Sequence, residues 1–88
     1  MVRSHKYMSF PDGTSVSVSD VTQEGVLVTF ERCANPCFPF AKVICNLSQG
    51  EWSNGIGFTL SESEYLLAFV GSNYSNLFQF AEIMTMTG

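Results

Sequence analysis

Apolar and polar residues alternate along the first half of the chain, and this alternation predicts a series of antiparallel strands. Residues 14–19 alternate small polar residues with valine, and residues 26–32 place Val26, Val28 and Phe30 on one face. A period of two is typical of a strand that buries one face. Shorter strands are expected at residues 7–10, 41–47 and 56–60. Turns that contain glycine are expected at residues 11–13, 23–25 and 48–51.

The pattern changes at Ser61, where a helix is expected to begin. Ser61 and Glu64 have the spacing of a capping box, in which each side chain accepts a hydrogen bond from the other residue's amide. Residues 65–70 are apolar all round, as in a short helix buried on several sides. Gly71 is expected to end this helix, and residues 72–75 to form a break or kink before a second helix or a packed tail. These elements predict an α+β fold, with an antiparallel sheet of about four strands followed by a C-terminal helix.

The length of 88 residues allows a single domain, over residues 1–88. The chain is 45% hydrophobic and contains eight Phe, whereas a chain this short buries only roughly 60% of its unfolded surface. One subunit therefore carries more apolar surface than it can hide, and a two-fold homodimer is expected. Residues 33–40 contain two prolines, which cannot donate to a sheet ladder, so an exposed loop or an excursion at the sheet edge is expected there.

The formal net charge of −4 disfavours a broadly basic, phosphate-binding surface. Every base lies within the first 42 residues, so any anion-binding face must come from that half. The bases are Arg3, Lys6, Arg32 and Lys42, accompanied by the single histidine, His5. Residues 1–6 are expected to form a flexible basic N-terminus, and no apolar run follows them as in a signal peptide.

No stretch of the sequence approaches the roughly 18–20 apolar residues of a membrane span. A soluble intracellular protein without membrane contact is therefore expected, in the cytoplasm of a bacterial or virus-infected cell or in a eukaryotic nucleus.

Three cysteines cannot all pair within one chain, and free thiols are expected in a reducing compartment. A zinc site built from Cys33, Cys37, Cys45 and His5 is the alternative, but the paired C-x-x-C spacing of structural zinc sites is missing. No metal or cofactor is expected. No hydrolase triad order, metalloprotease motif or phosphate-binding loop is present, so the chain is not expected to be an enzyme.

Three segments of the chain, residues 15–20, 25–32 and 55–65, resemble the domain of positive cofactor four. In that family of transcriptional coactivators and single-stranded-DNA binders, a V-S-V-x-D strand precedes a K-V-L-I-D-I-R-E strand. A K-G-I-S-L strand then enters a helix through an aromatic residue. The match covers about half of the chain, in the same order and with matching spacing, although each piece is short and of low specificity.

The resemblance implies a two-fold homodimer in which each subunit contributes a curved antiparallel sheet and a C-terminal helix. The helices would pack together at the dimer interface, and the concave sheets would bind unpaired nucleic acid strands. The interface residues that this arrangement implies are Tyr65, Leu66, Phe69, Val70 and Phe78.

The chain departs from the family where function is concerned. Residues 21–24 stand where the family carries basic and aromatic side chains, and Glu31 stands near a usual base. Arg32 follows Glu31 directly, so at period two it is expected to face the other way. The insert at residues 33–50 has no close counterpart in the family.

Single strands are bound by stacking bases on aromatic rings, at about 1–3 kcal/mol per base, while Lys and Arg follow the phosphates. Bases and rings coincide at two places in the sequence, and Trp52 and Arg32 are further candidates. The expected nucleic-acid-binding residues are Arg3, Lys6, Tyr7, Phe10, Arg32, Phe38, Phe40, Lys42 and Trp52. The alternative for the phenylalanines is a place in the core or in a dimer interface.

These observations lead to two hypotheses of function. The first is a homodimeric protein that prefers single-stranded DNA and acts as an accessory factor in transcription, replication or recombination, with transcription or replication proteins as further partners. The second is a protein-interaction or structural module that uses the same sheet and helix, through Phe38, Phe40 and Trp52, and does not bind nucleic acid.

Overall fold

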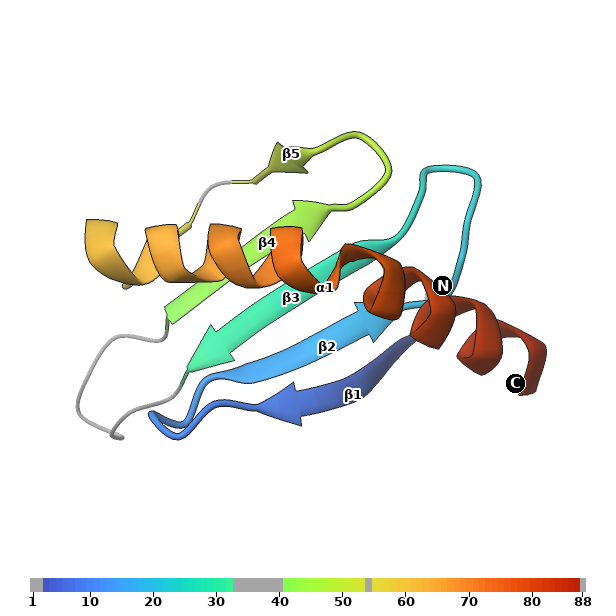
Figure 1. The fold of residues 1–88 in the computed structure, drawn as a ribbon, viewed down its shortest axis with the longest axis horizontal. Coiled ribbons are helices and arrows are strands. Elements are labelled where there is room, and N and C mark those ends of the chain that lie inside the picture. Colours follow the sequence, from blue (N-terminus) through green and yellow to red (C-terminus); the bar gives the residue numbers. More distant parts are fainter. Residues whose placement is uncertain (1–2, 33–40, 54, 88) are drawn as a thin grey trace.

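The computed structural model describes residues 3–32, 41–53 and 55–87. Five strands form one antiparallel sheet in which spatial order follows chain order, and one long helix crosses a face of this sheet (Figure 1). The elements are β1 (Ser4–Ser9), β2 (Ser15–Ser19), β3 (Leu27–Arg32), β4 (Ala41–Asn46), β5 (Glu51–Trp52) and α1 (Leu60–Thr87). The expected α+β order is confirmed, with a fifth, short strand.

The alternating segments form strands with the expected buried face. Val16, Val18, Val28 and Phe30 are completely buried beneath the helix, whereas the residues between them lie on the other face. Gly25 is required in the turn before β3, because its φ is +113° and a Cβ there would lie 2.7 Å from the Ser48 hydroxyl. Alternation together with these turns therefore accounts for the centre of the sheet.

The N-terminal strand is longer than expected. Residues 4–6, expected to belong to a flexible N-terminus, form the first half of β1 and pair with β2, which corrects that expectation. The register shifts by a β-bulge between Lys6 and Met8, so the alternation changes phase there. As a result Tyr7, which lies within the shift, and Phe10, which follows it, both contact aromatic rings of α1.

The strand expected at residues 56–60 is wrong. Only Ile56 pairs with the sheet, in an isolated bridge to Lys42, and Gly57 then turns the chain with a φ of +79°. The edge strand of the sheet is instead β5, where Trp52 pairs with Cys45 of β4. The loop expected at residues 33–40 lies outside the described residues.

The N-cap of the helix lies two residues earlier than expected, at Thr59 and not at Ser61. The Thr59 hydroxyl accepts a hydrogen bond from the Glu62 amide at 3.2 Å, and the Glu62 carboxylate accepts one from the Thr59 amide at 2.9 Å. This is a capping box with Thr59 as N-cap, so the box expected at Ser61 and Glu64 is wrong.

Gly71 does not end the helix, because α1 continues to Thr87. The break expected within residues 72–75 is present as a kink at Asn73, whose φ of −117° and ψ of 15° are not helical. The Asn73 side-chain amide donates to the Phe69 carbonyl at 3.0 Å. The last apolar segment is therefore a helical continuation beyond a kink.

The core lies between one face of the sheet and one face of α1. Leu66, Val70, Leu77 and Ala81 are the buried residues of the helix, and their spacing keeps them on one side of it. They pack in one cluster with the inward side chains of β2, β3 and β4. Within the described ranges, no helix combines the length and apolar character needed to cross a membrane.

Candidate functional site

Arg32 is held on the helix side of the sheet by two carboxylates and a ring. Its guanidinium forms ion pairs with Glu62, and with Asp12 at 3.2 Å, and lies 5.1 Å from the centre of the Phe58 ring. The expected opposite orientation of Glu31 and Arg32 is confirmed, since Arg32 pairs with the buried Ala41.

These contacts shift the acidity of all three groups. The Arg32 guanidinium, together with the Thr59 amide, lowers the pKa of Glu62 to about 2. The Thr14 backbone amide is the main cause that lowers the pKa of Asp12, and the Glu62 carboxylate raises the pKa of Arg32. Arg32 is therefore neutralised by its neighbours and fastens the start of α1 to β3.

Arg3 is neutralised in the same way at the other end of the sheet. Its Nε donates to Asp20 at 2.8 Å, and the His5 ring lies 2.7 Å from the second Asp20 oxygen. Hydrogen bonds from His5, and then from Arg3, lower the pKa of Asp20. A further hydrogen bond joins Arg3 to the Met84 carbonyl, so this cluster fastens the end of α1 to β1 and β2.

The aromatic residues expected to stack on bases lie on the helix side of the sheet. Phe10 is only 8% exposed and packs on Phe30 and Phe69. Tyr7 packs edge to face on the Phe80 ring at 5.0 Å, and Trp52 stacks on Phe30 at 6.0 Å. Phe10 is enclosed in the core, which corrects it as a stacking residue, whereas Tyr7 is half-buried against the same core and Phe38 and Phe40 lie outside the described residues.

The opposite, open face of the sheet carries the two expected lysines. Cross-strand pairing places Lys6 in a row with Ser17, Thr29 and Ile44. A neighbouring row contains Ser9, Ser15, Glu31 and Lys42, with Glu31 directly opposite Lys42. Within the described strands, no aromatic side chain lies on this face. The structure therefore separates Lys6 from Tyr7 and Phe10, whereas the rings expected beside Lys42 lie outside the described residues.

Two of the expected dimer-interface residues are internal. Leu66 and Val70 are buried against the sheet of the same chain, so a partner cannot reach them, and their assignment to an interface is corrected. Phe69 and Phe78 are half-buried and pack against the same core. Tyr65 is 51% exposed and is accessible to a partner. Homodimerisation itself stays a prediction.

A hollowed apolar area lies around Phe58, beside the first half of α1. Phe58 contributes to two adjoining hollows of about 230 and 370 Å³. We define the Phe58 surface as five of the apolar and aromatic residues that line them: Val43, Trp52, Phe58, Tyr65 and Leu67.

Core rings support the Phe58 surface from beneath. Trp52 stacks on the completely buried Phe30, and Tyr65 packs on Phe10 at 5.3 Å between ring centres. Leu67 is 58% exposed, although it faces the hollow that Trp52 and Phe58 line. The Leu67 side chain thus extends from α1 beside the apolar residues Val43, Trp52 and Phe58 that line the same hollow.

The sequence predicts Trp52 as a binding residue and Tyr65 as a dimer-interface residue, but it does not single out Phe58 or Leu67. The pattern places Phe58 in a strand, and both Tyr65 and Leu67 in a helix buried on several sides. The signal for Leu67 is present in the sequence, because a helix that is apolar all round offers more apolar surface than one sheet face can cover. Phe58 has no comparable local signal.

The described residues contain no group of three or more His, Cys, Asp or Glu side chains that could hold a metal ion. Cys45 is a buried free cysteine, and burial raises the pKa of its thiol to about 11. Cys33 and Cys37, two of the four residues of the alternative zinc site, lie outside the described residues.

Comparison of the chain with models of protein families, with curated proteins and with solved structures finds no match. The resemblance to the positive cofactor four domain therefore stays a prediction from sequence, and the functional argument rests on the geometry above.

Proposed function

We propose that the protein is a protein-interaction module that binds a partner protein through the Phe58 surface. The observation that carries this proposal is the exposure of Tyr65 and Leu67 beside two apolar hollows that share Phe58. Exposed apolar surface around a preformed hollow is typical of sites that bind protein or peptide. Leu60, 78% exposed in the first turn of α1, extends the apolar area along the helix.

The placement of the charged residues favours this function over nucleic-acid binding. Arg3 and Arg32 already contact carboxylates of the same chain, and Lys42 lies opposite Glu31. A nucleic acid strand would have to compete with these acids for the bases, against a net charge of −4. Of the rings expected to stack on bases, the three that the structure describes, Tyr7, Phe10 and Trp52, lie on the other side of the sheet from the lysines.

The proposal is tested by selecting displayed random peptides on the immobilised protein. Trp52 is the single tryptophan and lines one hollow, so its fluorescence reports the binding of each selected peptide, resynthesised without tryptophan. We expect apolar or aromatic peptides whose affinity falls by about tenfold or more in Leu67→Asp. Ile83→Asp is the matched control, because Ile83 is 57% exposed on the same helix, far from Phe58. Selection of no peptide, or equal binding by Leu67→Asp, would refute the proposal.

A second candidate function is single-strand binding at the open sheet face. The observation that favours it is the presence of Lys6 and Lys42 on one face with the hydroxyls of Ser15, Ser17 and Thr29. A labelled oligonucleotide should then bind more weakly as salt rises, with a single strand favoured over a duplex. Joint replacement of Lys6 and Lys42 by Gln should remove this binding, and Leu67→Asp should not.

A further inference from the structure

The charges that surround the Phe58 surface specify the kind of partner that fits it. Three carboxylates lie at or near the two hollows. Asp12 and Glu62 line one hollow together with the base Arg32, and Glu64 lies nearby on α1. Arg32 is shared by Asp12 and Glu62, which leaves an excess of negative charge. Residues 43–88, which supply most of this surface, include four acids and no base.

We propose that the occupant of the Phe58 surface is a basic amphipathic segment of a partner protein, with apolar anchors in the hollows and Lys or Arg around them. This inference rests on the proposed function and adds the chemistry of the partner. An apolar centre with charges at its rim sets specificity through complementary charge on the partner.

Glu64 is the residue best placed to recognise such a partner. It lies on the exposed side of α1, between Leu60 and Leu67 in the sequence and on the helix surface that joins them. Within the described part of the chain, Glu64 forms no ion pair, in contrast to Glu62. A cation on the partner can therefore pair with Glu64 without displacing a base of this chain.

The same charges disfavour two other occupants. A second copy bound through the same surface would bring the Glu62 and Glu64 carboxylates of both copies together, which costs free energy. A nucleic acid would place phosphates against these acids. The lysines of the described chain do not compensate, because Lys6 and Lys42 are directed to the open face on the other side of the sheet.

The test uses three synthetic amphipathic peptides without tryptophan. They share the same leucine positions and carry Lys, Gln or Glu at the remaining positions. Binding to the full chain is followed by Trp52 fluorescence at low and high salt. We expect the Lys peptide to bind most tightly, to weaken as salt rises, and to lose affinity in Leu67→Asp but not in Ile83→Asp.

Charge reversal on the helix provides a second, matched comparison. Glu64→Lys and Glu82→Lys change the net charge equally, but Glu82 lies near the far end of α1. We expect Glu64→Lys to weaken the Lys peptide by at least about twofold and Glu82→Lys to leave its affinity unchanged. Equal effects of the two variants would show that only net charge acts, and would overturn the inference.

The outcomes separate this inference from the proposed function. If the Gln or Glu peptide binds as tightly as the Lys peptide and Leu67→Asp abolishes binding, the apolar site stands and the basic partner is wrong. If none of the three peptides changes the fluorescence of Trp52, both proposals fail.

Discussion

Truncation of Leu77 tests whether the second half of α1 packs on the sheet of its own chain. Leu77 is completely buried, follows the kink at Asn73 and belongs to the same cluster as Val16 and Val18 of β2. Leu→Ala at a buried site costs about 2–5 kcal/mol, from lost burial and from the cavity left behind. Because Leu77 has no exposed surface, we expect Leu77→Ala to lower the free energy of unfolding by about 3 kcal/mol.

This loss is large for a domain of 88 residues, whose total stability is about 4–13 kcal/mol. The melting temperature should fall by roughly 12–24 °C, since about 4–8 °C is lost per kcal/mol in a domain of this size. Urea unfolding followed by circular dichroism measures the change, with Ile83→Ala as the control. Ile83 is exposed, so its truncation should cost about 0.5 kcal/mol or less. Equal costs for the two variants would refute the packing of this part of α1 on its own sheet.

Three further predictions concern the helix cap, an ion pair and a thiol. Thr59→Ala should cost about 1 kcal/mol of stability in urea unfolding, whereas Ser61→Ala should have little effect, because Thr59 is the N-cap. The depressed pKa of Glu62, about 2, means that its ionised carboxylate stabilises the fold above about pH 4.5 and loses this effect as the pH falls towards 2. The stability difference between wild type and Glu62→Gln should therefore be present at pH 6 and vanish near pH 2. Because burial raises the pKa of Cys45 to about 11, mass spectrometry should find its alkylation at pH 8 slow in the native protein and fast in urea.

The strands at the centre of the sheet could be predicted because their signal is local. In β2 valine alternates with serine, in β3 Val28 and Phe30 alternate with Thr29 and Glu31, and a glycine turn separates the two strands. Neighbouring strands joined by short turns pair antiparallel, so the order of the sheet follows from the same pattern. No contact from elsewhere in the chain is needed for this part of the fold.

The start of the helix could not be predicted, because the sequence contains two capping boxes. Thr59 with Glu62 and Ser61 with Glu64 have the same spacing. The structure uses the first, in which Glu62 also pairs with Arg32 of β3. That partner is 30 residues away in the chain. A local pattern does not include such a contact, and the choice between the boxes therefore depends on tertiary structure.

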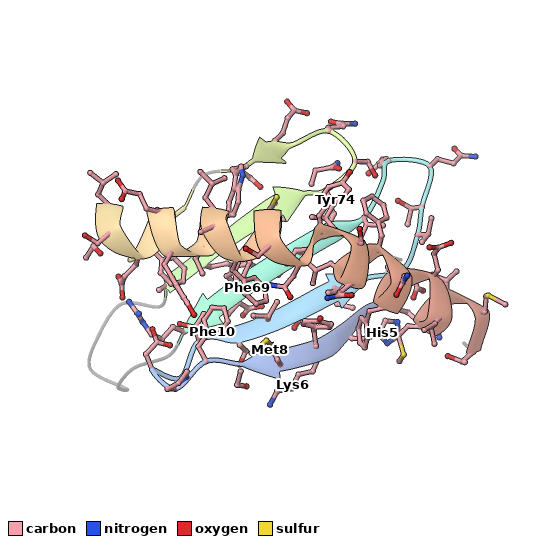
Figure 2. The ribbon with its side chains drawn as sticks, viewed as in Figure 1. His5, Lys6, Met8, Phe10, Phe69 and Tyr74 are labelled. Carbon is pink, nitrogen blue, oxygen red and sulfur yellow. The ribbon has the colours of Figure 1, made fainter. Side chains whose placement is uncertain are left out.

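The stacking site was misplaced for a related reason. Tyr7 and Phe10 stand near bases in the sequence, but with the register shift in β1 both rings contact aromatic rings of α1. Figure 2 shows Phe10 beside Phe69 of the helix. Lys6 points away from the helix in the same view. A bulge has no reliable sequence signature in a short strand. Residues that are neighbours in the sequence, such as Lys6 and Tyr7, can therefore lie on opposite faces of the sheet.

The apolar residues that one copy leaves exposed indicate where the expected dimer would form. On α1 the exposed apolar residues lie mainly in two places, one at the Phe58 surface and one at the far end with Ile83 and Met86. Carboxylates surround the first group and disfavour its pairing with a second copy. Any self-association should therefore use the far end, so Ile83→Asp should shift sedimentation equilibrium towards the monomer and Leu67→Asp should not. A wild-type protein that is monomeric at every concentration would refute the expected dimer. Dissociation of the dimer by Leu67→Asp alone would contradict the charge argument on which the basic partner depends.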